Sequence, residues 1–181
     1  MQNEKHLFEE ARVHPEAFGR IYDAFYPKIF GYLFRITGDY AVSCDICSET
    51  FLKAWINLSS FQWKGISISS WLFRIATNEL NQYFRKKKYS PARLTDFYAF
   101  DRGFLQNQRS DEDIALKLDL GEEFSDLLQK MKTLPSKYQK VIALKYFEEM
   151  SIREIAEVLG KKEGTVKSLL SRGLEKLKNK F

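Results

Sequence analysis

Apolar residues recur every three or four positions through several separate segments of this 181-residue chain. The first segment, from Pro15 to Ile36, places an apolar residue at almost every helical turn, which predicts a helix with one buried face. Pro27 lies inside it, and we expect this residue to kink or split the helix because proline lacks a backbone N–H. The apolar positions of the segment are Phe18, Ile21, Tyr22, Phe25, Ile29, Leu33 and Ile36.

Two more helices are predicted in the N-terminal half. Gly38 and Asp39 have the chemistry of a helix end followed by an N-cap, so a second helix should begin there. The segment 59–70 breaks the period and predicts a loop, after which a third helix is expected over about 70–88. A short helix is possible before the first one. The apolar positions of the second helix are Val42, Ile46, Phe51, Ala54, Trp55 and Leu58.

After residue 120 the helical pattern returns in four short units. Ser136 is expected to cap the second unit, and Ser151 with Glu154 forms a capping box that opens the third, which ends at Gly160. Two short helices joined by a tight glycine turn, the second of them strongly basic, have the layout of a helix-turn-helix. The units are expected at about residues 122–134, 137–147, 152–159 and from 163 onward.

Composition favours an all-α fold of two small domains. Nine Gly and four Pro are too few for the frequent turns of an all-β sandwich, and 181 residues exclude a full α/β barrel. No run approaches the 18 apolar residues of a membrane span, and the N-terminal residues lack a secretory layout, so we expect a cytoplasmic protein without membrane insertion. The expected organisation is a helical domain over 1–90, an extended linker over 91–120 and a second helical domain over 121–181.

Positive charge is concentrated in two blocks. The segment 160–181 carries seven basic and two acidic residues, an excess equal to the +5 of the whole chain. A second cluster, 85–88, ends the third predicted helix, whereas 91–120 has four basic and six acidic residues. Two basic blocks on either side of an acidic connector suggest two separate contacts with a polyanion. The connector also contains aromatic residues, which in one interpretation pack against one of the two domains. They are Phe97, Tyr98, Phe100 and Phe104.

The last predicted helix carries the most specific candidate site. In a helix-turn-helix the N-terminal half of the second helix lies in the major groove, so hydrogen-bond donors must be exposed early on that helix. Val166, Leu169, Leu170 and Gly173 are expected to face inward. Arg172 suits a guanine edge, and Lys167 suits a base or a phosphate. The alternative is a solvated basic face on an ordinary helical hairpin. The outward candidates are Thr165, Lys167, Ser168, Ser171 and Arg172.

A second polar stripe lies on the helix predicted over 71–88, with members spaced so that they share one face. Amide and guanidinium groups can contact base edges, and the aromatic residues Phe61, Trp63 and Trp71 can stack on an exposed base. This combination suits melted DNA better than duplex DNA. The alternative places the aromatic residues in the core and leaves a frayed basic end. The stripe consists of Arg74, Asn78, Asn81, Arg85 and Lys88.

The second predicted helix has an exposed stripe opposite Ile46, Ala54 and Trp55. Acidic residues around one exposed leucine are more typical of a protein-docking face than of a DNA-binding face. A plain solvated surface is the alternative. The stripe consists of Asp45, Ser48, Glu49, Leu52 and Lys53.

Several runs of the sequence, taken in order, resemble the extracytoplasmic-function (ECF) sigma factors of bacterial RNA polymerase, in the sigma-70 family. The resemblance implies a two-domain, all-helical initiation factor that directs promoter-specific transcription, with region 2 recognising and melting the minus-ten element and region 4 recognising the minus-thirty-five element. The implied partners are core RNA polymerase, through the β′ clamp helices and the β flap, promoter DNA and an anti-sigma factor. The runs are DICSETFLKAW (45–55), WLFRIATN (71–78) leading to RKKK (85–88), LP (134–135), SIREIAEVLG (151–160) and GTVKS (164–168).

The resemblance also assigns roles to the candidate residues. The linker would extend toward the RNA channel of the polymerase. The sequence departs from the family pattern at Ser48, where Gln is usual, at Cys44, where Glu is frequent, and at Gln82, where many members have Asp. The positions that match the docking site for the polymerase clamp are Asp45, Ser48, Glu49 and Leu52. The loop that captures a flipped minus-ten base matches residues 61–70, helped by Asn78 and the helix after it. The positions that match minus-thirty-five contacts are Lys167, Ser168, Ser171 and Arg172.

Cys44 and Cys47 form a CxxC at the beginning of the second predicted helix. A redox pair is one interpretation, and half a zinc site completed by His6 and His14 is another, although nothing brings the histidines there. We expect small, partly buried residues, with no metal and no cofactor. No phosphate-binding glycine loop, HExxH or Ser-His-Asp set occurs, so we expect no enzymatic activity.

Two other classes of protein are alternatives to an initiation factor. A two-domain helix-turn-helix regulator would bind duplex DNA without polymerase, as a dimer on paired half-sites. A scaffold that binds only proteins would leave the basic recognition helix unexplained.

Overall fold

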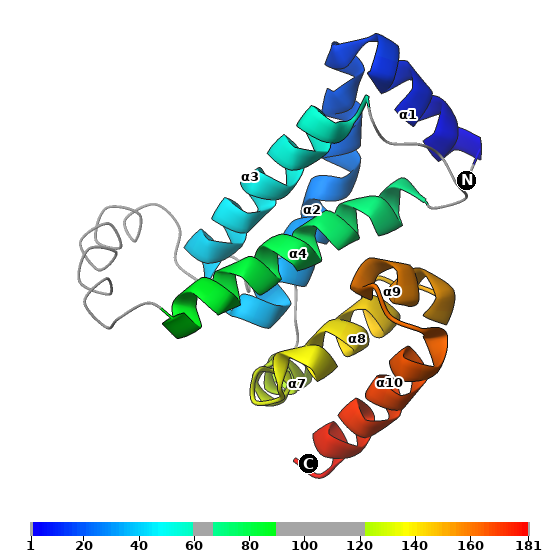
Figure 1. The fold of residues 1–181 in the computed structure, drawn as a ribbon. Coiled ribbons are helices and arrows are strands. Elements are labelled where there is room, and N and C mark those ends of the chain that lie inside the picture. The colour runs from blue at the N-terminus through cyan, green and yellow to red at the C-terminus, as the bar shows by residue number, and fades with distance from the viewer. Residues whose placement is uncertain (1, 60–66, 90–121, 181) are drawn as a thin grey trace.

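The computed structural model describes residues 2–59, 67–89 and 122–180, and every regular element in these ranges is helical. The predicted all-α class is therefore confirmed. Figure 1 shows two groups of helices, one from each end of the chain. The N-terminal domain contains α1 (Gln2–Val13), the 3-10 helix η1 (Pro15–Ala17), α2 (Phe18–Thr37), α3 (Tyr40–Asn57) and α4 (Ile68–Tyr89). The C-terminal domain contains α7 (Glu122–Lys132), α8 (Ser136–Tyr146), α9 (Ile152–Leu159) and α10 (Glu163–Lys178).

The core of the N-terminal domain lies between α2, α3 and α4. Tyr32 of α2 is at its centre, fully buried, with its ring edge-on to Phe73 at 5.3 Å between centroids. The Tyr32 and Thr77 hydroxyl oxygens are 2.9 Å apart, so one hydrogen bond satisfies two buried polar groups. This bond fixes the rotation of α4 relative to α2. Fully buried side chains of this core include Ile21, Ile29, Leu33, Ala54, Ile68, Leu72, Phe73, Ala76 and Leu80.

The predicted boundary between α2 and α3 is confirmed. Gly38 ends α2 in the left-handed conformation with φ 64°, and the Asp39 side chain accepts a hydrogen bond from the Val42 N–H as the N-cap of α3. Pro27 does not split α2, which runs unbroken from Phe18 to Thr37. The expected split is therefore wrong, because Pro27 and Asp23, whose carbonyl loses its helical partner, both lie on the exposed side, where water can replace the missing bond.

The C-terminal domain is built around α8, which packs on both α9 and α10. Val141, Ala143 and Leu144 of α8 are completely buried. The expected Ser136 cap is wrong: Ser136 is the first residue of α8, Pro135 occupies the N-cap position, and the Ser136 hydroxyl is buried without a hydrogen-bond partner. Pro135 has an extended ψ of 138°, so the turn into the helix comes one residue earlier than the pattern predicted.

The predicted helix-turn-helix is confirmed in its local structure. The Ser151 hydroxyl accepts from the Glu154 N–H, and the Glu154 carboxylate accepts from the Ser151 N–H at 2.9 Å, which completes the capping box of α9. Gly160 ends α9 with φ 60°. Gly173 of α10 lies so close to α8 that a Cβ there would come within 3.2 Å of the Ile142 side chain.

The two domains pack against each other along α4 and α9, whose Cα atoms approach within 8 Å, and α2 also contacts α7 and α8. In Figure 1 α9 lies below the N-terminal half of α4, and α8 extends from there below the middle of that helix. The predicted linker, 91–120, and the predicted aromatic residues Phe61 and Trp63 lie outside the described residues. Within the described residues, no helix combines the length and the apolar character needed to cross a membrane.

Candidate nucleic-acid interface

The outward face of α10 is the strongest candidate surface. Val166 and Gly173 are buried and Leu169 and Leu170 are half-buried, so the inner face is as predicted. The opposite face presents hydroxyl, ammonium and guanidinium donors, and no acidic residue interrupts it between Gly164 and Leu174. The Ser168 hydroxyl donates to the Gly164 carbonyl at 3.0 Å, which turns its oxygen along the helix. All five predicted residues are exposed: Thr165, Lys167, Ser168, Ser171 and Arg172.

The beginning of α10 leaves backbone donors available. Lys162 occupies the N-cap position with an extended backbone and no side-chain cap. The first N–H groups of a helix lack partners inside the helix and carry partial positive charge, so they attract anions such as phosphate. This end of α10 therefore adds a backbone contribution to the basic face.

The polar stripe on α4 is also exposed. Arg74, Asn78, Asn81 and Arg85 are all on the surface, on the side away from Leu72 and Leu80. The side chain of Lys88 lies outside the described residues, as do Phe61 and Trp63. Trp71 is half-buried and packs edge-on against Phe8 of α1 at 6.1 Å between centroids, so it contributes to the core of the domain rather than to an open stacking surface.

The stripe on α3 is exposed at four of its five predicted positions, Asp45, Ser48, Glu49 and Leu52. Burial, with the nearby Asp39 charge, raises the pKa of Asp45 above its ordinary value. Lys53 does not belong to the open stripe, because its Nζ is 2.6 Å from the Glu79 carboxylate of α4. The pair joins α3 to α4 and is partly screened by solvent.

Two apolar residues extend the α3 surface. Trp55 was expected to be buried but is 42% exposed, with its ring edge-on to Phe18 at 5.0 Å. Ile56, which belongs to neither the predicted apolar face nor the predicted stripe, is 64% exposed. Ile56 follows Leu52 by four residues, and an apolar residue one turn beyond an outward leucine is the signal that would have identified it. The surface is thus more apolar than the acidic stripe suggested.

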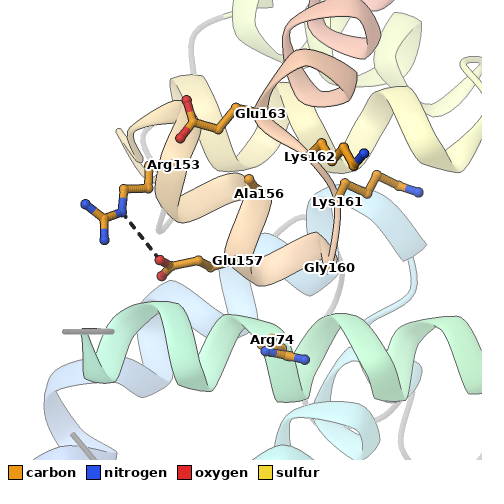
Figure 2. A pocket seen from close by; sticks show the side chains of 8 residues that line it. All are labelled: Arg74, Arg153, Ala156, Glu157, Gly160, Lys161, Lys162 and Glu163. Carbon is orange, nitrogen blue, oxygen red and sulfur yellow. Dashed lines mark ion pairs between the residues drawn. The ribbon is translucent and has the colours of Figure 1, made fainter. Parts of the chain in front are cut away.

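Between α4 and the helix-turn-helix lies a surface cavity of about 470 Å³. Figure 2 shows Arg74 on α4 facing the end of α9, the turn and the first residue of α10. Basic side chains outnumber acidic ones here, and Arg153 pairs with Glu157 within α9 at 3.6 Å. The other lining residues are Ala156, Gly160, Lys161, Lys162 and Glu163.

The CxxC pair is placed on the inner side of α3. Cys47 is fully buried and Cys44 is half-buried. Burial, with Cys44 nearby, raises the pKa of Cys47 to about 12, so its thiol stays protonated near neutral pH. The described residues contain no group of three or more His, Cys, Asp or Glu side chains placed to hold a metal ion.

Comparison with known families matches both halves of the chain. Residues 21–89 match the model of Sigma-70 region 2, and residues 124–177 match the model of Sigma-70, region 4. The order of the two matches is the order of the two domains. The combination of these two regions in one all-helical chain, with a helix-turn-helix in the second region, identifies the class of bacterial sigma factors.

Individual relatives show which group of sigma factors the chain resembles. The ECF RNA polymerase sigma factor SigW of Bacillus subtilis is 34% identical over 186 residues, which covers 100% of this chain and 97% of the relative. RNA polymerase sigma factor YlaC of the same organism is 31% identical over 166 residues, covering 91% of this chain and 92% of the relative. The ECF RNA polymerase sigma factor BldN of Streptomyces coelicolor is 30% identical over 164 residues, covering 90% of this chain and 59% of the relative.

Two solved structures share the fold. Sigma factor RpoE from Bartonella quintana, solved in complex with the anti-sigma factor NepR, superposes with a TM-score of 0.65 at 20% identity, covering 90% of this chain and 94% of that one. CnrH, solved in complex with the cytosolic domain of CnrY, gives a TM-score of 0.65 at 22% identity, covering 97% of this chain and 95% of that one. At these identities the likeness concerns the fold.

The chain belongs to the ECF sigma factors of the sigma-70 family. It is a subunit that binds core RNA polymerase and directs initiation at promoters that carry minus-ten and minus-thirty-five elements.

Proposed function

We propose that residues 121–181 recognise the minus-thirty-five element through the exposed face of α10. The single observation that carries this proposal is the acid-free donor face, which extends from Thr165 to Arg172 on the second helix of a helix-turn-helix. Arg172 is suited to two parallel hydrogen bonds to one guanine, and Lys167 to a base edge or a phosphate. Thr165, Ser168 and Ser171 supply hydroxyl groups to neighbouring bases or phosphates.

We infer a separate task for residues 1–90, namely minus-ten recognition and docking on the polymerase. The exposed amides Asn78 and Asn81 suit base edges, and Arg74, Arg85 and Lys88 suit the phosphates of the opened strand. Phe61 and Trp63 would stack on an unpaired base. On α3, Leu52 supplies an apolar contact, and Asp45, Ser48 and Glu49 supply polar ones to the β′ clamp helices.

The remaining assignments are proposed on the family relationship. Residues 91–120 connect the two recognition domains within the holoenzyme. The protein works in the cytoplasm, has no catalytic chemistry of its own, and is held inactive by an anti-sigma factor until a signal releases it. The β flap is the proposed polymerase contact of the C-terminal domain.

Run-off transcription with purified core polymerase tests the proposed function. Sheared genomic DNA is the template, and reactions with and without this protein are compared. Discrete new transcripts are expected, and aligning their start sites will yield the two promoter elements. If no transcripts form while the protein retards specific duplex DNA as a dimer, the polymerase-independent regulator takes its place.

A further inference from the structure

The first helix of the chain lies before the part that matches the family. The match to Sigma-70 region 2 begins at residue 21, whereas α1 ends at Val13. In Figure 1 α1 lies at the end of the N-terminal domain where α3 ends and α4 begins. Phe61 and Trp63, the proposed stacking residues, occur in the sequence between those two helices. This placement lets α1 contact the chain on both sides of the stacking residues.

Before the stacking residues, the contact is made by Arg12 of α1. Its guanidinium donates from Nη2 to the Ser59 backbone carbonyl at 3.2 Å. Leu58, one residue earlier, is 5% exposed, and its N–H donates to the Trp55 carbonyl. Since Ser59 comes only two residues before Phe61, the Arg12 hydrogen bond limits the directions in which the chain can leave α3.

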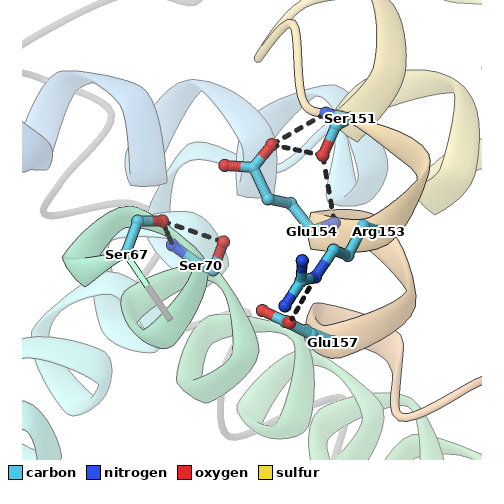
Figure 3. A network of polar contacts seen from close by, with 6 residues as sticks. All are labelled: Ser67, Ser70, Ser151, Arg153, Glu154 and Glu157. Carbon is cyan, nitrogen blue, oxygen red and sulfur yellow. Dashed lines mark hydrogen bonds and ion pairs between the residues drawn. The ribbon is translucent and has the colours of Figure 1, made fainter. Parts of the chain in front are cut away.

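After the stacking residues, the chain is fixed at the beginning of α4. The Ser67 hydroxyl accepts from the Ser70 N–H and donates to the Ser70 hydroxyl, both at 3.0 Å (Figure 3). The Trp71 N–H donates to the Ser67 carbonyl, also at 3.0 Å. Ile68 is completely buried. Ser67 is thus a cap that sets where α4 begins.

The same helix α1 connects these two fixed points. Phe8 is 1% exposed, and its ring is edge-on to Trp71 of α4 at 6.1 Å between centroids. Ala11 is also 1% exposed, so the helix is firmly seated directly before Arg12. Phe8 and Arg12 are four residues apart and lie next to each other on one side of α1. One side of α1 therefore contacts α4 through Phe8 and Ser59 through Arg12.

The hydrogen bond of Arg12 contributes little to the stability of the fold. The Arg12 side chain is exposed, so water competes for both the guanidinium and the Ser59 carbonyl. Arg12 lies in the last turn of α1, where a cation also interacts favourably with the final helix carbonyls. A contact of this kind can restrict the position of a chain segment without being needed for folding.

We propose that Arg12 is a positioning residue for minus-ten base capture, which acts by holding the Ser59 carbonyl so that Phe61 and Trp63 meet the unpaired base. The proposal rests on the proposed stacking role of those two aromatic residues. Arg12 does not contact the DNA in this role. A segment that is restricted before binding loses less conformational freedom on binding, so its affinity for the base is higher.

The test uses holoenzyme assembled from core polymerase and the full-length protein. The ligand is a single-stranded oligonucleotide with the non-template strand of the minus-ten element found by run-off transcription. A second oligonucleotide has an abasic site at the captured position, which keeps the phosphates and removes only the base. The captured position is the one where the abasic site weakens binding of the wild type but not of the double variant Phe61→Ala with Trp63→Ala.

The measured quantity is the base-to-abasic ratio, defined as the affinity for the intact oligonucleotide divided by the affinity for the abasic one. Arg12→Ala is expected to lower this ratio about fivefold, or about 1 kcal/mol, with the affinity for the abasic oligonucleotide unchanged. Arg12→Lys keeps a cationic donor and should recover most of the ratio. A purely structural effect would weaken binding of both oligonucleotides equally and leave the ratio unchanged.

Arg20→Ala is the matched control. Arg20 of α2 pairs with Glu10 of α1, so this variant removes the same charge and another surface contact of α1 without touching Ser59. The base-to-abasic ratio of Arg20→Ala should equal that of the wild type. An equal fall of the ratio in Arg20→Ala and Arg12→Ala would overturn the proposal, because the effect would then belong to the lost charge or to α1 as a whole.

An unchanged ratio in folded Arg12→Ala would also overturn the proposal. If both oligonucleotides bind more weakly by the same factor, Arg12 contacts a phosphate instead. The wild type separates this failure from that of the proposed function. A wild-type ratio above one, with no change in Arg12→Ala, removes only the role of Arg12. A wild-type ratio of one at every position removes the stacking role of Phe61 and Trp63, and the positioning role with it.

Discussion

The two domains place their candidate recognition helices differently. In the N-terminal domain the recognition helix α4 is also the centre of the core, with Leu72, Phe73, Ala76 and Leu80 completely buried. In the C-terminal domain the centre is α8, and α10 lies at the edge with only Val166, Gly173 and Leu177 buried. One helix therefore combines packing and recognition, whereas the other separates them.

This difference determines what a substitution can reveal. A change on α4 alters stability and DNA binding together, because its exposed amides are carried by a helix that α1, α2 and α3 of the same domain hold in place. A change on the outer face of α10 leaves the core of its domain intact.

The largest effect is expected for Phe73→Ala, which tests whether α4 is the structural centre. Loss of this fully buried ring next to Tyr32 should lower the free energy of unfolding by about 3–5 kcal/mol. Chemical denaturation of the full chain measures it. The control is Ile56→Ala, at a side chain 64% exposed, which should cost under about 0.5 kcal/mol. A loss below about 1 kcal/mol for Phe73→Ala would show that α4 is peripheral.

Arg172→Ala tests whether recognition by α10 is separate from stability. We expect a loss of about 1–3 kcal/mol at one promoter position, with a relaxed base preference there and an unchanged free energy of unfolding. Binding to duplexes with each base at that position measures it. Lys176→Ala, further along the exposed face of α10, is the control and should weaken all sequences equally. A uniform loss for Arg172→Ala would assign that residue to a phosphate.

Glu49→Lys tests whether the N-terminal domain has a second, independent surface on α3. Reversing an exposed charge on the proposed docking stripe should weaken binding to core polymerase about tenfold, or about 1.4 kcal/mol, without unfolding either domain. Glu175→Lys on α10 makes the same charge change at another exposed site and serves as the control. Equal affinities of wild type and Glu49→Lys for the core enzyme would remove Glu49 from the docking surface.

Ser151→Ala gives the smallest expected effect and tests how far the C-terminal domain depends on local structure. Its hydroxyl is the N-cap of α9, so the substitution should cost about 1 kcal/mol of stability. Ser171→Ala, exposed within α10, should change stability by no more than about 0.5 kcal/mol. Thermal unfolding of both variants provides the comparison, and equal midpoints would show that the capping box adds nothing measurable.

Local signals in the sequence predicted most of the helices and their ends. The Asp39 N-cap, the Gly38 and Gly160 stops and the Ser151–Glu154 capping box are all present, because each depends on groups within four residues. The inward and outward faces of α10 follow from the 3.6-residue period for the same reason. The roles of the exposed residues on α3, α4 and α10 stay predictions until the binding experiments are done.

Errors arose where a residue's environment comes from elsewhere in the chain. Pro27 leaves α2 intact because its side of the helix faces water, and Trp55 is 42% exposed although its ring packs edge-on against Phe18. Lys53 looked like part of an open stripe, but Glu79, 26 positions further on, binds it. Neither periodicity nor composition records which helix will lie beside such residues.

The sequence by itself determined the helices, their caps, the basic face of α10 and the family, since these depend on residue type, short-range spacing and ordered motifs. Only the tertiary structure decided that α4 is the centre of its domain, that Tyr32 pairs with Thr77, and that Arg35 meets Glu148 across 113 positions of the chain. The physical reason is that buried polar pairs form between elements brought together by packing, and their energy depends on the loss of water around both partners.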